Sequence, residues 1–267
     1  MSRPTASTDP EDYYQAFSFE TGLADWLWPN RRHEQLKLIV GEILRGRKGL
    51  RILDVGCGTG VMADYLTRYG TVTGTDFSRP AIRLAQALTS GPAFRAGRIE
   101  DLDPEARFDL ITLFDVLEHI PAGERDEFLA GLRARLADGG AIVASTPHPT
   151  NNRWIASNRP ELLQVVDEPV ELSELTKSAG RLGMELVYYR AFDIAWRRHY
   201  QVMVLEPVAG AEDGASLDPR LRSRLRAAGN PAALVIRRLK LAGRALRARR
   251  AALARWLLVR RGEPPQP

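Results

Sequence analysis

A nine-residue run, ILDVGCGTG at residues 52–60, constrains this chain most: an apolar segment ends in three alternate glycines. The run predicts a buried strand that ends in a sharp turn, with a helix beginning near Val61. Glycine is needed there because the chain bends tightly and because a ligand must reach backbone that a Cβ atom would cover. The run therefore predicts an α/β fold with a cofactor bound at the turn.

Two classes of cofactor bind at a turn of this kind. The dinucleotide fingerprint G-x-G-x-x-G would place its third glycine at position 61, where this chain has Val61. Asp54 would also repel a pyrophosphate, whereas a carboxylate at that point suits a ligand that carries an ammonium group. The pattern therefore argues against an NAD-dependent oxidoreductase, which is the rival enzyme class.

Residues 49–207 alternate short β-like runs with helical segments, which is typical of parallel strands joined by crossover helices. An apolar stripe of Phe128, Leu129, Leu132 and Leu136 predicts one helix, closed by the breaker Asp138-Gly139-Gly140. The last two β-like runs are about ten residues apart, too close for a helical crossover, so we expect an antiparallel hairpin. The runs are Arg51–Val55, Thr71–Thr75, Leu110–Phe114, Ala141–Ser145, Leu186–Tyr189 and Tyr200–Leu205.

The net charge of +5 is unevenly distributed. Residues 1–210 hold 24 lysines and arginines against 29 acidic residues, whereas residues 211–267 hold 14 against 4. Residues 231–262 predict a basic amphipathic helix, which could pack on the body or a second subunit, or bind an anionic membrane, an acidic partner or nucleic acid. We expect three parts: a helical, aromatic lid segment (1–48), a cofactor-binding core (49–207) and a linker with a basic tail (208–267).

Several classes are excluded by what the sequence lacks. Cys57 is the single cysteine, so neither a disulfide framework nor a cysteine-based zinc site is available, and no other spacing specifies a metal site. No apolar run reaches the length of a membrane span, and the N-terminus lacks a secretion signal. We therefore expect a cytoplasmic protein, with peripheral membrane contact left open for the tail.

The glycine run resembles the first motif of class I S-adenosylmethionine-dependent methyltransferases, and further segments follow in that family's order. Phe108–Ile111 and Asp115–His119 resemble the fourth strand and its exit in small-molecule O-methyltransferases of the ubiquinone-biosynthesis type. The resemblance implies a doubly wound, mostly parallel, seven-stranded Rossmann-like sheet with an antiparallel terminal hairpin. It also implies S-adenosylmethionine as cofactor and methyl transfer to a hydroxyl of a small acceptor in secondary-metabolite, quinone, sugar or lipid biosynthesis.

The resemblance assigns cofactor contacts to residues at the ends of strands. Asp76 stands where the family places the acid that binds both ribose hydroxyls, and residues 98–102 resemble the segment that forms the adenine pocket. The glycines could instead form a purely structural turn, and Asp76 could only cap a helix. The candidate cofactor-binding residues are Asp54, Gly56, Gly58, Gly60, Asp76, Phe77, Ile99, Glu100 and Asp115.

Methyl transfer to a hydroxyl is helped by a base with a pKa near neutral, which histidine supplies best, although positioning alone could suffice. His119 follows the fourth strand and His148 follows the fifth, so both should face the end of the sheet where cofactor and acceptor meet. Either could instead hold its loop by packing, and we expect His33 and His199 to be structural or surface residues. The catalytic candidates are therefore His119 and His148.

The absence of one motif narrows the range of possible methyl acceptors. Enzymes of this class that methylate the exocyclic amines of nucleic-acid bases or glutamine amides usually carry an Asn/Asp-Pro-Pro-aromatic loop after the fourth strand. This chain has FDVL there, at residues 114–117. Nucleic acid is therefore not the expected substrate. We expect specificity to come from the aromatic N-terminal segment and from the insert Thr150–Val170, which contains Trp154. The alternative without catalysis is a cofactor-binding scaffold whose tail recruits RNA or a membrane.

Overall fold

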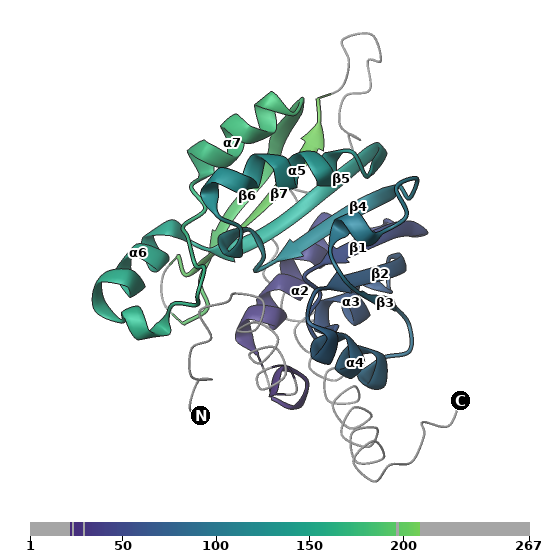
Figure 1. Ribbon diagram of the computed structural model, residues 1–267, viewed down its shortest axis with the longest axis horizontal. Coiled ribbons are helices and arrows are strands. Elements are labelled where there is room, and N and C mark those ends of the chain that lie inside the picture. Colours follow the sequence, from purple (N-terminus) through teal and green to yellow (C-terminus); the bar gives the residue numbers. More distant parts are fainter. Residues whose placement is uncertain (1–21, 23, 29, 196–197, 209–267) are drawn as a thin grey trace.

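A seven-stranded sheet forms the centre of the protein, with the strand order β3-β2-β1-β4-β5-β7-β6 (Figure 1). The structure is a computed structural model that describes residues 22, 24–28, 30–195 and 198–208. The first five strands run parallel, whereas β7 is antiparallel to both of its neighbours, which confirms the predicted fold class and the terminal hairpin. The strands are β1 (Leu50–Val55), β2 (Gly70–Asp76), β3 (Ala93–Ala96), β4 (Phe108–Phe114), β5 (Leu136–Pro147), β6 (Met184–Phe192) and β7 (Tyr200–Pro207).

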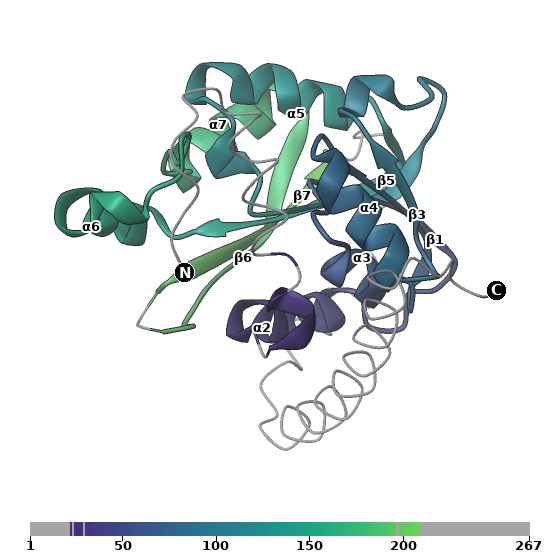
Figure 2. The ribbon, with the colours of Figure 1, turned by 60° about the horizontal axis from the view of Figure 1, so that its bottom comes forward.

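Helices cover both faces of the sheet because successive strand residues point to opposite sides. Leu53 and Val55 of β1 belong to the apolar core beneath α5 and α7, whereas Leu50 and Ile52 belong to the core beneath α2 and α3. Figure 2 shows these two pairs of helices on opposite sides of the sheet. The helices are α2 (Arg31–Ile43), α3 (Val61–Leu66), α4 (Arg79–Leu88), α5 (Arg125–Arg133), α6 (Pro149–Asn158) and α7 (Leu172–Arg181), with short 3-10 turns at 99–101, 117–119, 122–124 and 160–162.

Two details of the sequence interpretation were wrong. The helix with the stripe at Phe128 ends at Arg133, and Leu136 already belongs to β5, where it pairs with Phe108 beside a register shift. The breaker at 138–140 therefore lies within a strand, and Gly139 has the left-handed φ of 67°. The edge strand β3 was missed because its four residues are mostly exposed and lack apolar alternation.

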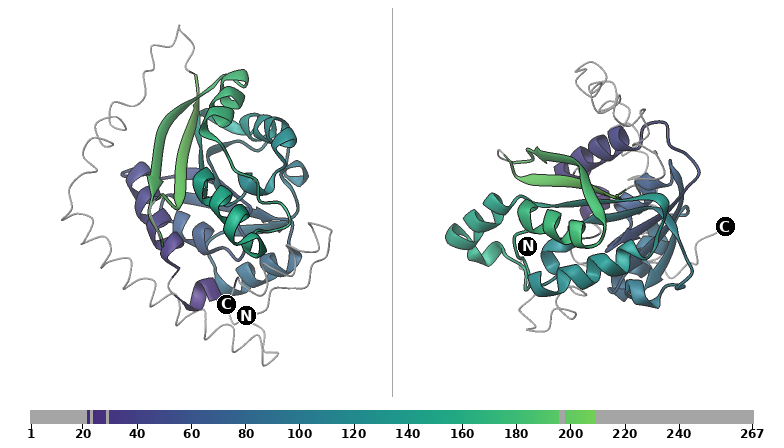
Figure 3. Two further views of the ribbon diagram at one scale, coloured as in Figure 1. Left: turned by 90° about the vertical axis from the view of Figure 1, so that its left-hand side faces the viewer. Right: turned by 90° about the horizontal axis from the view of Figure 1, so that it is seen from above.

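The segment between β5 and α7 carries an insert that stands out from the sheet. It holds α6 and the turn Pro160–Leu162, and α6 projects to the left in Figure 1. The β6–β7 hairpin, green in Figure 3, forms the opposite edge from β3, with α7 packed on β6. No helix in the described part of the chain is long and apolar enough to cross a membrane.

The order of the strands fixes where a ligand can bind. β1 lies between β2 and β4, so the connections that leave β1 and β4 diverge to opposite sides of the sheet. Ligands of open α/β sheets bind at this divergence, beyond the carboxyl ends of the strands. The aromatic residues before Gly22 and the helix predicted over residues 231–262 lie outside the described residues, whereas the later part of the predicted lid segment (1–48) forms α2.

Candidate active site

The glycine turn after β1 adopts a backbone that only glycine takes without strain. Gly56, Gly58 and Gly60 have φ angles of 65°, 52° and 83°, all in the left-handed region. A Cβ on Gly56 would lie 2.5 Å from the Val116 side chain, and one on Gly60 would lie 2.7 Å from the ring of Phe94. A Cβ on Gly58 would meet nothing within 4 Å. Two glycines are therefore needed for packing, and Gly58 leaves its backbone open to a ligand.

A cavity of about 570 Å³ lies at this turn. All predicted cofactor-binding residues line it except Gly60, which instead forms the N-cap of α3. His119 also lines the cavity, together with residues from the first turn of α2 and from the insert. One space therefore joins the predicted cofactor residues to a candidate base, and it falls where the connections from β1 and β4 diverge.

Asp54 is the most deeply buried acid of the cavity, with 1% of its surface exposed. Its Oδ1 accepts a hydrogen bond from Thr112 Oγ1 at 2.6 Å, whereas its Oδ2 is buried without a partner. Burial raises the pKa of Asp54 to about 7. A buried carboxylate oxygen with no donor is costly, so a ligand that brings an ammonium group would satisfy it.

Asp76 ends β2 beside the glycine turn. Its Oδ2 accepts from the backbone N–H of Gly58 at 2.9 Å, and its Oδ1 accepts from that of Ser78 at 2.8 Å. Each carboxylate oxygen keeps one further acceptor site, which is what two adjacent hydroxyls would need. Ser78, and not Asp76, caps α4 through its side chain, so the helix-cap alternative for Asp76 is wrong.

These residues fit the cofactor that the resemblance implies. S-adenosylmethionine carries an ammonium group, which Asp54 would bind, and a ribose with two adjacent hydroxyls, which Asp76 would bind. Its adenine would lie against the part of the cavity wall formed by Phe77, Ile99 and Glu100. Ile99 is buried and Glu100 is exposed, so the wall has an apolar side and a solvent side. The fit rests on the unpartnered oxygen of Asp54 and on the open backbone at Gly58.

The other end of the cavity holds a partly buried ion pair that the sequence did not predict. Arg32, in the first turn of α2, pairs with Asp115 at the exit of β4. Asp115 has a left-handed φ of 58°, which is strained for a residue with a side chain. Four buried polar atoms in and around this pair have no hydrogen-bond partner: Arg32 Nε, His33 Nδ1, Asp115 Oδ1 and Glu118 Oε2. An unsatisfied polar cluster of this kind is suited to a polar acceptor.

His119 is held in one tautomer by the insert. Its Nδ1 lies 2.6 Å from the carbonyl oxygen of Val166. Because a carbonyl only accepts, Nδ1 carries the hydrogen and the basic lone pair of the neutral ring is on Nε2. Burial lowers the pKa of His119, so the ring is neutral near pH 7 and can take up a proton.

The second histidine candidate has a different position. His148 is the N-cap of α6, where its Nδ1 accepts from the backbone N–H of Thr150 at 3.2 Å. His148 is not among the residues that line the cavity, whereas His33, which we expected to be structural or at the surface, is buried and lines it. The geometry therefore favours His119 over His148 as the base.

The sequence interpretation missed Arg32, Thr112 and Val166. Arg32 precedes an ordinary amphipathic helical pattern, and Val166 acts through its backbone oxygen, so neither carried a local signal. Thr112 gave a weak signal, a hydroxyl in the middle of the apolar run 110–114 of β4. The described residues contain no group of three or more potential metal ligands, and Cys57 is a free, buried thiol.

Known proteins resemble this chain in sequence and in fold. The sequence profile of a family described as a methyltransferase domain matches residues 28–200. A ubiquinone biosynthesis O-methyltransferase from Alkalilimnicola ehrlichii is 40% identical over 162 residues, which are 55% of this chain and 65% of that protein. One from Paramagnetospirillum magneticum is 35% identical over 117 residues, 42% of this chain and 46% of that protein. The matches thus span about half to two thirds of these relatives.

Solved structures share the fold at lower sequence identity. Magnesium protoporphyrin IX methyltransferase from Synechocystis PCC 6803, solved with bound SAH, superposes with a TM-score of 0.61 at 18% identity, covering 74% of this chain and 97% of that one. A methyltransferase from Streptomyces caelestis gives a TM-score of 0.57 at 18% identity, covering 76% of this chain and 100% of that one. These likenesses establish the fold.

Proposed function

Because the chain belongs to the methyltransferase-domain family, we propose that it transfers a methyl group from S-adenosylmethionine to a hydroxyl of a quinone-type small molecule. The family confirms the predicted class of protein and its cofactor. The hydroxyl acceptor and its quinone type are supported by relatives named as ubiquinone biosynthesis O-methyltransferases. One observation carries the proposal: the glycine turn, the unpartnered Asp54 oxygen and His119 share one cavity.

The chain's contribution begins with positioning. When bound, S-adenosylmethionine would supply a methyl group that its sulfonium already activates, and it would leave as S-adenosylhomocysteine. Asp54 would accept the ammonium hydrogen bonds, Asp76 the two ribose hydroxyls, and the wall at Phe77 and Ile99 would contact the adenine. These contacts would hold the cofactor in one orientation, and orientation of this kind supplies much of the rate of a displacement.

The acceptor's proton goes to His119. Nε2 of the neutral ring would take the proton that the acceptor hydroxyl gives up, and the Val166 carbonyl would stabilise the imidazolium through Nδ1–H. The negative charge of Asp115 also favours the charged ring. The Arg32–Asp115 pair and its unsatisfied neighbours would bind the acceptor's polar groups.

Methyl transfer to a panel of acceptors tests the proposal. Purified protein is incubated with isotopically labelled S-adenosylmethionine and with quinols, catechols, sugars and amines, and products are identified by mass spectrometry. We expect a labelled methyl ether on a quinol or catechol. Binding of S-adenosylhomocysteine without any labelled product would favour the cofactor-binding scaffold, and methylation of amines alone would overturn the hydroxyl assignment.

A further inference from the structure

Arg125 is the first residue of α5. Its side chain is buried, with 8% of the residue exposed, yet Arg125 does not line the cavity. A buried guanidinium needs several acceptors to offset its loss of hydration. The identity of these acceptors shows which parts of the chain Arg125 connects.

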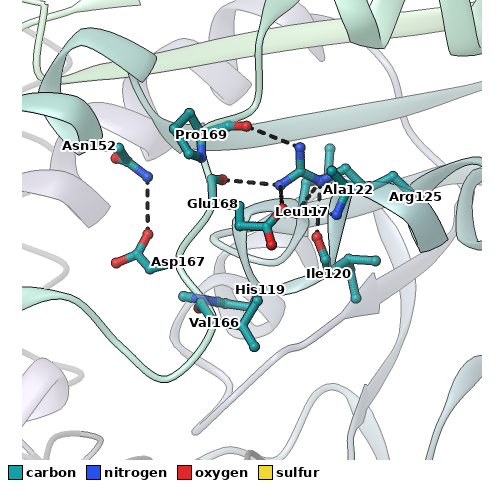
Figure 4. Close-up of polar contacts among 10 residues, drawn as sticks. All are labelled: Leu117, His119, Ile120, Ala122, Arg125, Asn152, Val166, Asp167, Glu168 and Pro169. Carbon is teal, nitrogen blue, oxygen red and sulfur yellow. Dashed lines mark hydrogen bonds and ion pairs between the residues drawn. The ribbon is translucent and has the colours of Figure 1, made fainter. Parts of the chain in front are cut away.

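The guanidinium of Arg125 binds two segments that are far apart in the sequence. Its Nε donates to the carbonyl oxygens of Leu117 and Ile120 at 3.1 and 3.0 Å. Its two terminal nitrogens donate to the carbonyl oxygens of Glu168 and Pro169 at 3.1 and 3.0 Å. Figure 4 shows the guanidinium between these two segments. The first segment, residues 117–122, carries His119, and the second, residues 166–169, is called the strap here.

Three further contacts fasten the strap to the His119 loop. The backbone N–H of Glu168 donates to the carbonyl of Glu118 at 2.9 Å, and the side chain of Glu168 accepts from the N–H of Ala122 at 2.9 Å. His119 Nδ1 donates to the strap carbonyl of Val166 at 2.6 Å. The contact that fixes the tautomer of the ring therefore comes from the strap that Arg125 holds.

We propose that Arg125 is a positioning residue for methyl transfer: it holds the strap against the 117–122 loop, and the strap in turn orients His119 toward the cavity. The proposal rests on the proposed function of His119 as the base. Four backbone carbonyls converge on Arg125, and only a planar guanidinium with its donors in a fixed fork serves both segments together. The cavity is lined by residues of both segments, namely His119, Ile120 and Val166. A shift of the strap would therefore also change the shape of the cavity around His119.

The test compares Arg125→Lys and Arg125→Ala with the wild type. A lysine keeps the charge but has one nitrogen, so it cannot span both segments. We expect kcat to fall about tenfold in R125K and about 100-fold in R125A, since small displacements of a catalytic group have effects of this size. The KM for S-adenosylmethionine should stay unchanged, because no contact of Arg125 reaches the glycine turn. Because a loss of folded protein would also lower the apparent kcat at an unchanged KM, rates are expressed per S-adenosylhomocysteine-binding site, titrated by calorimetry.

Arg181→Ala is the matched control. Arg181 is also an arginine beside α5, but its side chain is 59% exposed and pairs with Asp126 at the surface. R181A should therefore keep wild-type kcat. If R125A fails to fold, R125K decides: wild-type kcat in R125K, or an equal rise in both KM values, overturns the proposal.

Hydrogen exchange separates this proposal from the proposed function. The backbone N–H groups of Ala122 and Glu168 bridge the loop and the strap, so we expect both to exchange faster in R125K than in R181A. This readout needs no acceptor. If the wild type lacks methyl transfer but R125K shows faster exchange, the proposed function fails while the strap contact stands. Unchanged exchange at both amides overturns the role of Arg125.

Discussion

The two halves of the cavity are assembled in different ways. The cofactor half holds the glycine turn with Asp54 and Asp76, and the acceptor half holds Arg32, Asp115 and His119. In the cofactor half, the bond from Gly58 to Asp76 joins positions 18 residues apart, at the ends of neighbouring strands. In the acceptor half, Arg32 reaches Asp115 over 83 residues, and His119 reaches Val166 over 47 residues. Backbone geometry thus shapes the first half, whereas side chains from separate elements shape the second. We expect substitutions in one half to leave the ligand of the other half bound.

The largest difference between the effect on turnover and the effect on cofactor affinity is expected for His119→Ala. Removal of a general base typically lowers the rate by about 10²- to 10⁴-fold, so kcat should fall within that range. The affinity for S-adenosylhomocysteine, measured by calorimetry, should stay at the wild-type value because Asp54 and Asp76 are untouched.

His148→Ala is the control for that substitution. His148 caps α6 and is not among the residues that line the cavity, so H148A should keep wild-type kcat and its pH profile. Equal losses of rate in H119A and H148A would contradict the assignment of the base. Wild-type kcat in H119A would mean that positioning alone suffices.

Asp54→Asn should have the converse effect, because it changes the half of the cavity that would bind the cofactor. Loss of a hydrogen bond to a charged group costs about 1.5–3 kcal/mol, which corresponds to roughly 10- to 150-fold weaker binding of S-adenosylhomocysteine. Asp109→Asn is the matched control, since Asp109 pairs with exposed Arg51 at the far end of β4. An unchanged affinity in D54N would show that the ammonium group binds elsewhere.

D54N should not be unstable. Burial raises the pKa of Asp54 to about 7, above the value of about 3.9 in an unfolded chain. The folded state therefore holds a proton that the unfolded state has lost, and the wild type loses stability as pH rises from about 4 to about 7. An asparagine does not titrate, so D54N should show the greater thermal stability at pH 8. A lower melting temperature there would contradict the raised pKa.

The cofactor half was predictable from the sequence because local rules determine it. Positive φ angles require glycine, and the carboxyl ends of parallel strands meet at one edge of the sheet. These two rules predicted the positions of Gly56, Gly58 and Asp54, and the resemblance to the methyltransferase family added Asp76. The strand alternation predicted the sheet for the same reason, except for the short, exposed β3 and the start of β5.

The acceptor half was not predictable to the same degree. His119 was found because it follows a strand, but Arg32 lies on a helix whose docking angle depends on tertiary packing. The tautomer of His119 depends on a backbone carbonyl, which carries no residue-specific signal. Asp115 was predicted to bind the cofactor, and its pairing with Arg32 adds a partner that no local pattern contained.

A smaller effect is expected from pH on the affinity for S-adenosylhomocysteine. Below a pKa of about 7, Asp54 in the free protein is protonated, and a ligand ammonium group must displace that proton. The affinity for S-adenosylhomocysteine should therefore fall by up to about tenfold per pH unit below 7 and level off above it. Calorimetry from pH 5.5 to 8.5 measures this slope. D54N should lose it, and a slope that persists in D54N would assign the linkage to another group.

The smallest expected effect tests whether the halves are separate at all. The described part of the N-terminal segment touches both: Trp26 Nε1 donates to the carbonyl of Thr59 in the glycine turn at 2.9 Å, and Asp25 lines the cavity near Arg32. Trp26→Phe keeps the apolar packing and removes that hydrogen bond, at a cost of about 1 kcal/mol. We expect a few-fold rise in the KM values of both substrates, because one displaced segment affects both halves. A rise for S-adenosylmethionine alone would show that the segment serves only the glycine turn, and the comparison would then hold without exception.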